Sequence, residues 1–468
     1  MAPTEYDLIP YPTMPRQQTH PDRLAAVGKL FGMEPAPVEN CRVLEIACSD
    51  GGNLIPMACA LPESRFVGLD LASVPIAAGQ RMAADLGLNN ITLQACDVRD
   101  IDDSWGEFDY ILAHGLYSWV PEEVRERLLA VCRERLADEG IAFISYNAYP
   151  GGHIRQMLRE MMLYYIRNAK TASLKIAQAR DFLKTLQQAK ALSPAWQAVW
   201  EEEAKLMFDR DDAGLYHDEL ADCHQRFYFH EFAAAASRHG LDYLGEAEPH
   251  EMFDPKGMLP GFQGDMIEFE QRLDFLKSRR FRQTLLCRSE RQLQRRTSPE
   301  QMAGFLFSAP GRRKDDGQIE GARGVCIGTS NEAAIRVATA LGEVYPLPVP
   351  FEELVPYAGG AEALGAMLYE MMIVGFVNLH VFDFPCQDTV TERPRASRLA
   401  RYQAARSKAV TSAVHISTNL DEVSRRLVGL LDGTRNFDQL AAALTVAKAR
   451  EFLRPCLEQM ASHGLLEG

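Results

Sequence analysis

The sequence predicts an α/β protein built on a mainly parallel β-sheet with helices on both faces. From residue 42 onward, short apolar runs rich in Val, Ile and Phe alternate with segments of helical periodicity, which is typical of parallel strands buried on both faces. Later in the chain, two more strand-like runs at 241–248 and 282–288 are placed to complete one edge of the sheet as an antiparallel pair.

The elements follow in a regular order. A Pro- and Tyr-rich lead-in over 1–21 is expected to be extended and to act as a cover, and a helix at 22–32 starts with Pro21. Five strands are then expected at 41–47, 65–71, 90–97, 108–115 and 141–147, with helices at 53–61, 74–88 and 121–137. A helix at 230–239 precedes the antiparallel pair.

The chain of 468 residues is too long for one ordinary core, and we expect four parts. Residues 1–153 and 225–290 form the sheet-containing core, and 154–224 form a helical insertion with apolar positions at helical spacing. A smaller middle domain is expected at 291–358 and a mostly helical domain at 359–468. The apolar face of the insertion predicts a homodimer.

Composition narrows the class of protein. A balance of 50 basic against 64 acidic residues, a net charge of −14, argues against a nucleic-acid-binding protein. The ten cysteines form no CxxC pair or zinc-like cluster, and His and carboxylates are not clustered, so we expect no metal and a reducing compartment. The N-terminus lacks a signal-peptide pattern, and the longest apolar stretch, 371–382, is too short for membrane insertion. A cytoplasmic location is expected.

The stretch LEIACSDGGNL (44–54) predicts a ligand-binding turn. A strand, a turn of small residues and then a helix present free backbone N–H groups to a ligand. The turn gives five candidate contacts: Glu45, Ala47, Cys48, Gly51 and Asn53. A second carboxylate, Asp70, ends the next strand 19 residues beyond Gly51 and is placed to accept the hydroxyls of a ribose, with Leu71 beside it.

These features alone fit either a nicotinamide or an S-adenosylmethionine enzyme, and three details favour S-adenosylmethionine. The turn lacks the G-x-G-x-x-G pattern that a pyrophosphate requires. Asp97, followed by Val98, comes after the third strand and is placed to accept a hydrogen bond from an adenine amino group. The antiparallel edge is unusual in dehydrogenase sheets. For Asp97 the alternative is a turn aspartate, and for Asp70 a helix cap.

Polar and aromatic side chains at the same edge of the sheet predict where the reaction takes place. They are His114, Tyr117 and Trp119 after the fourth strand, and Tyr146 and Asn147 at the end of the fifth. Such groups can relay the proton of an amine, and aromatic faces favour a sulfonium or methylammonium cation. Tyr11 of the lead-in is expected to cover the pocket, and His114 also to contact the cofactor. The alternatives are that Tyr117 and Trp119 are core aromatics and that Tyr146 and Asn147 serve a turn.

Five sequence strings follow one another in an order that resembles class I S-adenosylmethionine-dependent methyltransferases. They are E-x-A-x-S-x-G-G-N (45–53), GLDL (68–71), ACDV (95–98), FDYILAHG (108–115) and LADEGIAFIS (136–145). Four further segments are more specific, because they are similar to bacterial members that carry a methyltransferase regulatory domain. They are HGLYSWVP (114–121), SYNAYPGGH (145–153), the lead-in (9–32) and FRQTLLCR (281–288). The tail strings RPRASRLARYQAA (393–405) and LLDGTRNFDQLAAAL (430–444) are similar to the C-terminal domain of the same group.

The resemblance implies a seven-stranded, Rossmann-like class I sheet with S-adenosylmethionine as cofactor and a winged-helix-like C-terminal domain. Because that group includes lysine methyltransferases of bacterial outer-membrane proteins, the leading hypothesis is N-methylation of protein lysines. Two alternatives stay open: O- or N-methylation of a small metabolite, and a non-catalytic scaffold that binds the cofactor.

Overall fold

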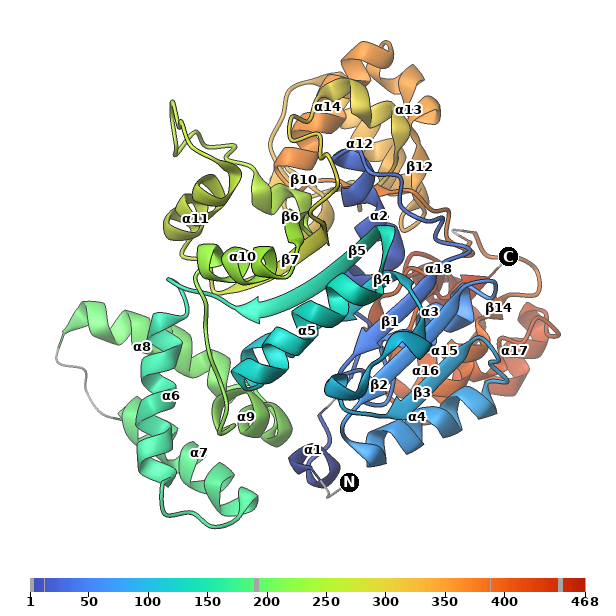
Figure 1. The fold of residues 1–468 in the computed structure, drawn as a ribbon. Coiled ribbons are helices and arrows are strands. Elements are labelled where there is room, and N and C mark those ends of the chain that lie inside the picture. The colour runs from blue at the N-terminus through green and yellow to red at the C-terminus, as the bar shows by residue number, and fades with distance from the viewer. Residues whose placement is uncertain (1–3, 12, 189–192, 388, 445–448, 468) are drawn as a thin grey trace.

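The computed structural model describes residues 4–11, 13–188, 193–387, 389–444 and 449–467. Its centre is a seven-stranded sheet in the order β3-β2-β1-β4-β5-β7-β6 (Figure 1). The strands are β1 (Arg42–Ile46), β2 (Arg65–Asp70), β3 (Ile91–Ala95), β4 (Phe108–Ala113), β5 (Leu136–Asn147), β6 (Leu241–Glu246) and β7 (Phe281–Arg288).

The predicted antiparallel edge is confirmed. Neighbours among β1 to β5 run parallel, whereas β7 pairs antiparallel with both β5 and β6. β5 is longer than expected because it begins at Leu136, which pairs with Phe108 across a register shift. The Leu136 carbonyl also accepts a hydrogen bond of 2.8 Å from Arg288 Nε on β7, so both neighbouring strands hold the early start of β5.

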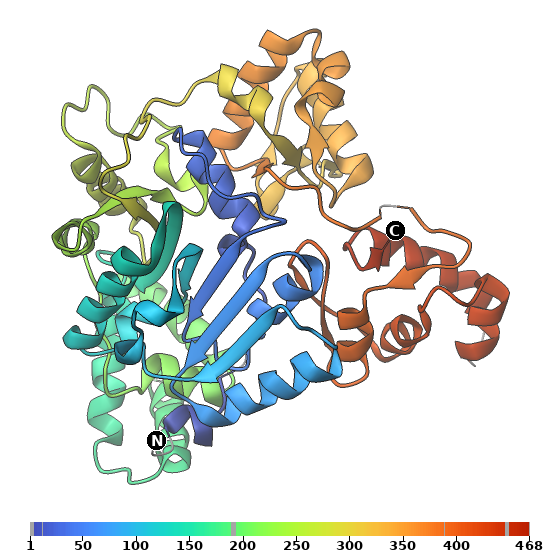
Figure 2. The ribbon, with the colours of Figure 1, turned by 45° about the vertical axis from the view of Figure 1, so that its right-hand side comes forward.

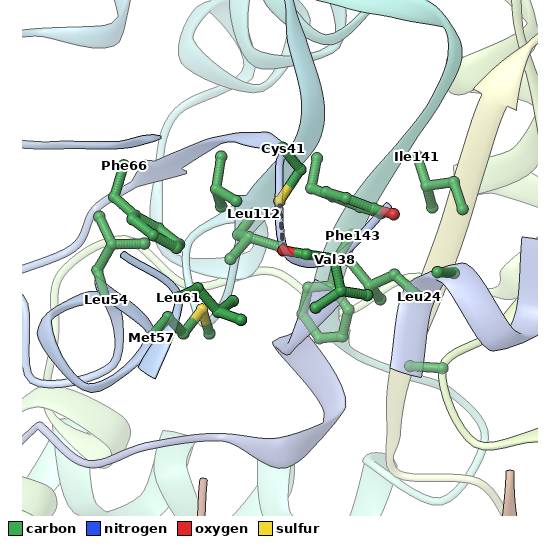
Figure 3. Packing of buried hydrophobic residues seen from close by; sticks show 14 of the residues in the cluster. Leu24, Val38, Cys41, Leu54, Met57, Leu61, Phe66, Leu112, Ile141 and Phe143 are labelled. Carbon is green, nitrogen blue, oxygen red and sulfur yellow. Dashed lines mark hydrogen bonds between the residues drawn. The ribbon is translucent and has the colours of Figure 1, made fainter. Parts of the chain in front are cut away.

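Helices cover both faces of the sheet. On one face lie α2 (Pro21–Leu30), α3 (Leu54–Ala60) and α4 (Ser73–Asp85), and on the other α5 (Glu122–Arg135) and α10 (Phe229–Arg238). Figure 3 shows the first face, where Leu54 and Met57 of α3 lie near Phe66 of β2, and Leu24 of α2 lies near Phe143 of β5. Side chains therefore alternate between two apolar layers along each strand, as a parallel sheet requires.

A helical insertion separates β5 from α10. Its helices are α6 (His153–Ile166), α7 (Ala172–Gln188), α8 (Pro194–Phe208) and α9 (Asp212–Glu219), and they project to one side of the sheet (Figure 1). They form a hydrophobic core of their own around Met162, Leu183 and Met207. After α10 and β6, α11 (Met266–Lys277) leads into β7.

The middle part packs as one unit that extends past residue 358. It contains β8 (Leu306–Ser308), β9 (Arg312–Arg313), β10 (Ile319–Glu320), β11 (Cys326–Ile327), α12 (Glu332–Val344), β12 (Val349–Pro350), α13 (Phe351–Ala358), α14 (Ala361–Ile373) and β13 (Asn378–His380). One buried cluster joins Phe307 and Leu341 to Leu368 and Leu379. The boundary expected between 358 and 359 therefore falls inside this core, because α14 and β13 close it.

The last unit is mostly helical, in agreement with the expected winged-helix-like architecture. It contains β14 (Arg395–Ala396), α15 (Arg398–Ala404), β15 (Ala409–Thr411), β16 (Ser417–Asn419), α16 (Glu422–Leu430), α17 (Phe437–Leu444), α18 (Ala449–Ala461) and β17 (Leu466–Glu467). Figure 2 shows this unit, in red, beside the N-terminal part of the sheet. It also contacts the middle unit, because Val414 packs with Leu347 in a small buried cluster.

The lead-in contains a short helix, α1 (Glu5–Leu8), where an extended course was expected. Thr4 and Asp7 form a capping box that fixes the start of this helix. The 3₁₀ turns of the chain are η1 (Gln17–Thr19), η2 (Val98–Asp100), η3 (Asp103–Trp105), η4 (Tyr117–Trp119), η5 (Pro249–Met252), η6 (Pro299–Gly304) and η7 (Ala322–Gly324). Among the helices that the structure describes, none combines the length and the apolar character needed to cross a bilayer.

Candidate functional site

A cavity of about 690 Å³ lies at the carboxyl ends of β1, β2 and β4 and beside the segment that follows β3. Open α/β sheets bind ligands at this edge, because the strand order reverses there. Eleven of the candidate residues line the cavity: Tyr11, Glu45, Ala47, Cys48, Asn53, Asp70, Leu71, Asp97, Val98, His114 and Trp119. The sequence pattern thus locates eleven of the 31 residues that line the cavity.

The turn after β1 keeps a left-handed backbone without the expected glycines. Ala47 and Ser49 have φ values of 65° and 51°, and Gly51 has a φ of 73°. An L-residue in this conformation costs about 1–2 kcal/mol, which Gly avoids. Gly51 itself lies outside the cavity wall. A Cβ there would lie 3.1 Å from Leu93 Cδ1 of β3, so the glycine lets the turn pack closely on the sheet.

Asp70 fixes this turn from the neighbouring strand. Its Oδ2 accepts a hydrogen bond of 2.8 Å from Ser49 N, and its Oδ1 accepts one of 2.8 Å from Ala72 N. Burial raises the pKa of the carboxyl group. A carboxylate can accept about four hydrogen bonds, so Asp70 retains capacity for ligand hydroxyl groups.

Asp97 lies at the cavity wall but is already engaged by Arg99. Its carboxylate accepts hydrogen bonds from Arg99 Nε at 3.0 Å and from Arg99 N at 2.9 Å. This interaction lowers the pKa of Asp97. Asp97 therefore serves partly as the turn aspartate of the alternative interpretation, and a ligand amino group would share the carboxylate with Arg99.

Glu45 carries the most unusual carboxylate of the site. It is 4% exposed, and its Oε1 accepts a hydrogen bond of 2.8 Å from Asn53 Nδ2. The other oxygen, Oε2, is buried and has no partner among the described residues. Burial raises the pKa of Glu45 to about 8. A buried carboxylate oxygen at a cavity wall is poised to receive a cationic group.

His114, which follows β4, is held as a neutral imidazole. Gly115 N donates to Ser145 Oγ at 2.8 Å, and Ser145 Oγ lies 3.1 Å from His114 Nδ1. Accepting from Gly115 leaves the Ser145 hydroxyl proton available for donation to Nδ1, and in that tautomer the ring proton is on Nε2. Burial lowers the pKa of His114 to about 4.

Trp119 lines the cavity, and His224 packs against its ring. Its ring centroid lies 4.4 Å from that of His224, and His224 Nε2 lies 3.2 Å from Asn147 Nδ2. Asn147 does not line the cavity. Its backbone N donates to Ser118 Oγ at 2.9 Å, so Asn147 ties the end of β5 to η4, which carries Trp119.

Two of the expected aromatic residues point into the core instead. Tyr117 lies edge-on to Phe232 at 5.0 Å, and Tyr146 stacks on Phe232 at 4.3 Å. The Tyr146 hydroxyl is 3.3 Å from Thr284 Oγ1, away from the cavity. Alternation along β5 gives the reason: Ser145 faces His114, so the next side chain faces the opposite layer. For Tyr117 the core interpretation holds.

Part of the wall comes from residues that the sequence patterns did not single out. They are contributed by the lead-in (Thr4, Glu5, Tyr6, Thr13, Met14, Arg16), by α5 (Glu123, Val124) and by α9 of the insertion (His217, Asp218). Tyr11 Oη donates to Asp218 Oδ2 at 3.2 Å, and Tyr6 stacks on His217 at 4.1 Å. No signal marks α9, because its position depends on how the whole insertion docks.

The cavity has an acidic lining. Its carboxylate residues are Glu5, Glu45, Asp70, Asp97, Glu123 and Asp218, against the guanidinium groups of Arg16 and Arg99. Asp97 is paired with Arg99, and Asp218 with Arg210. A concave site with an excess of one charge favours ligands of the opposite charge, so this cavity favours cations.

Three family models match the chain. They are described as "Methyltransferase domain" over residues 43–140, "Predicted methyltransferase regulatory domain" over 211–288, and "PKMT, C-terminal winged helix domain" over 392–459. The first covers β1 through the start of β5, and the second covers α9 through β7.

Two uncharacterized proteins of Rickettsia prowazekii are similar in sequence. One is 38% identical over 306 residues, which are 64% of this chain and 55% of that protein. The other is 37% identical over 234 residues, which are 50% of this chain and 94% of that protein. The chain therefore spans about half the length of the first relative and nearly all of the second.

Among solved structures, PKMT2 from Rickettsia typhi superimposes with a TM-score of 0.86 at 27% identity, covering 98% of this chain and 100% of that one. Its complex with AdoHcy superimposes with a TM-score of 0.84 at 27% identity, over the same shares of the two chains. The strand order, the three family matches and these relatives agree with the resemblance seen in the sequence. The chain belongs to the class I S-adenosylmethionine-dependent methyltransferases that carry a methyltransferase regulatory domain.

Proposed function

We propose that this protein transfers the methyl group of S-adenosylmethionine to the side-chain nitrogen of lysines in a protein substrate. The observation that carries the proposal is the acidic cavity at the carboxyl edge of the sheet, with a buried, unpaired oxygen of Glu45 in its wall. Both the cofactor and a lysine are cationic, so both suit this lining. The likeness to PKMT2, a protein lysine methyltransferase, supports the lysine substrate.

The order of the strands predicts how an elongated cofactor is oriented along the edge of the sheet. Asp97 follows β3, Asp70 ends β2, Glu45 lies near the end of β1 and His114 follows β4. These strands are neighbours in the order β3-β2-β1-β4. Adenine at Asp97 and ribose at Asp70 place the amino-acid part toward Glu45. The unpaired Glu45 oxygen then receives the α-ammonium group of the cofactor.

The protein's part in methyl transfer is mainly to hold the two reactants in line. When bound, the cofactor supplies an electrophilic methyl group on a sulfonium. Trp119 presents an aromatic face to the acceptor cation, and the nearby Glu123 carboxylate adds negative charge at the wall. The lysine nitrogen attacks only as the neutral amine, so its proton must first pass to solvent. Neutral His114 adds no positive charge that would oppose binding of the cofactor. Tyr117 and Tyr146 are excluded from contact with the acceptor because they point into the core.

Incubation with radiolabelled S-adenosylmethionine tests the proposal. We expect label in lysine-containing surface proteins, with methyllysine found after acid hydrolysis. Label in low-molecular-weight compounds alone would instead support the metabolite alternative. Isothermal titration with S-adenosylhomocysteine tests the cofactor separately, and a lack of binding would exclude both methyltransferase hypotheses.

A homodimer through the insertion is also proposed. Apolar side chains are exposed on its outer helices, with Tyr164 68%, Leu174 44% and Leu206 44% exposed. Exposed large apolar side chains gathered on one unit are typical of an interaction surface. Light scattering at micromolar concentration should give twice the mass of one chain.

A further inference from the structure

The last unit of the chain contacts the cofactor-binding part of the cavity at one buried point. His415, in the loop between β15 and β16, places Nε2 2.9 Å from Oδ1 of Asn53, the N-cap residue of α3. His415 is 3% exposed and Asn53 is 6% exposed. Asn53 in turn donates to Glu45 Oε1 at 2.8 Å. A direct chain of hydrogen bonds thus leads from the C-terminal unit to the cavity wall.

The backbone of His415 is held in an unfavourable conformation. Its φ is 60°, in the left-handed region that L side chains rarely adopt. The loop keeps this shape through hydrogen bonds from Ser412 N to Ile416 O at 2.9 Å and from His415 N to Ser412 O at 3.1 Å. Strained residues of this kind gather at functional positions, where the surrounding structure fixes them.

The hydrogen bonds of Asn53 fix which way its amide group faces. Oδ1 accepts from Arg16 N at 2.8 Å and from His415, so the oxygen must point toward these two donors. Nδ2 must then point toward Glu45 and toward Thr19 Oγ1, which lies at 3.0 Å. Burial lowers the pKa of His415 well below 6.5, so the ring is neutral and donates its single proton from Nε2.

We propose that His415 is a positioning residue: through Asn53 it orients Glu45 toward the cofactor's ammonium group, and the C-terminal unit thereby sets the affinity for the cofactor. The inference rests on the proposed function. The Asn53 amide occupies Glu45 Oε1, so Oε2, which has no hydrogen-bond partner among the described residues, is the oxygen left for the ligand. Without the His415 proton, the amide loses one of the two N–H donors that fix it, and Glu45 loses a fixed partner.

The groups around Glu45 determine how the affinity for the cofactor changes with pH. Asp50 and Asp70 raise its pKa, as burial does, whereas the Asn53 hydrogen bond lowers it. From the other elements packed against this region, Arg16 lines the cavity and His20 lies 5.3 Å from the ring of His415. Burial lowers the pKa of His20 to about 4, so this ring is neutral near pH 8. Loss of the Asn53 interaction therefore raises the pKa of Glu45, and cofactor binding then requires a higher pH.

Two substitutions of similar size test the role of the His415 proton in the full chain. His415→Gln keeps an N–H donor at a similar reach, whereas His415→Met has no donor. Isothermal titration with S-adenosylhomocysteine between pH 6.5 and 9 should show about three- to tenfold weaker binding for His415→Met, the effect of one hydrogen bond. Its affinity should also rise at higher pH than that of the unsubstituted protein, and His415→Gln should restore both.

Gln17→Ala is the matched control at the same contact between units. Gln17 Nε2 donates to Val414 O at 3.1 Å but does not touch Asn53, so its loss should leave affinity and pH profile unchanged. Equal affinities for all variants would overturn the inference, and so would equal losses in His415→Met, His415→Gln and Gln17→Ala. If the unsubstituted protein does not bind S-adenosylhomocysteine, the proposed function fails instead.

Discussion

Substitution of Glu45 by Gln removes an ionisable group from the cavity wall while it keeps the shape of the side chain and its bond to Asn53. The pKa of this carboxyl group is about 8 in the folded protein, against 4.5 for an ordinary glutamate. Between these values, the folded protein keeps a proton that the unfolded chain has released. Because the folded state then binds more protons, the contribution of Glu45 to stability decreases as pH rises from 4.5 to 8.

The size of this effect follows from the pKa difference. At pH 7 the unfolded chain gains about 3 kcal/mol by releasing the proton, at about 1.4 kcal/mol for each pH unit above 4.5. A neutral Gln avoids this cost. Because the entropy of unfolding of a 468-residue chain is about 1 kcal/mol/K, the ligand-free Glu45→Gln protein should melt roughly 3 °C higher at pH 7. The difference between the two proteins should shrink toward pH 5.

Cofactor binding should change in the opposite direction. A charged hydrogen bond to the cofactor's ammonium group contributes about 1.5–3 kcal/mol, so Glu45→Gln should bind S-adenosylhomocysteine roughly ten- to a hundredfold more weakly at pH 8. Differential scanning fluorimetry across pH and isothermal titration measure the two effects. A variant that melts no higher at pH 7, or binds with unchanged affinity at pH 8, would refute the assignment of Glu45 as a buried partner for a cation.

Three further substitutions test other parts of the site. Asp70→Ala removes the acceptor for the ribose and two bonds to the turn, and titration should show at least tenfold weaker binding of S-adenosylhomocysteine; unchanged affinity would contradict the ribose assignment. Trp119→Ala should raise KM for the protein substrate more than it changes cofactor affinity, and an effect on the cofactor alone would place Trp119 elsewhere. Tyr164→Glu adds a charge to the exposed face of α6, and light scattering should then give the mass of one chain; a retained dimer would move the interface away from α6.

The sequence predicts the sheet well because buried parallel strands have a strong local signal. It also locates Glu45, Asp70 and Asp97, since a residue at the carboxyl end of a strand reaches the same edge in any such sheet. The sequence is less informative about which face of the sheet a given side chain points to. Tyr146 is expected beside the acceptor, but the period-two alternation of β5 points Ser145 toward His114 and Tyr146 into the opposite apolar layer.

Contacts between distant parts of the chain have no local signal. His217, Asp218 and His415 come from units whose positions depend on large packed surfaces, and no spacing rule connects them to residue 45. The boundary expected at 358/359 is misplaced for the same reason, because Leu364 and Leu368 of α14 lie in the same hydrophobic core as Phe307. A change in composition marks a change in local structure but does not show which segments share a core.

The late position of β7 also has a consequence for synthesis of the chain. While β1 to β5 leave the ribosome, the edge of β5 from Ala142 to Asn147 has no partner until Phe281–Arg288 has been made. An unpaired apolar strand edge promotes association between nascent chains. Fragments that stop after the first five strands should therefore aggregate, and the shortest soluble form of the methyltransferase core should extend through Arg288.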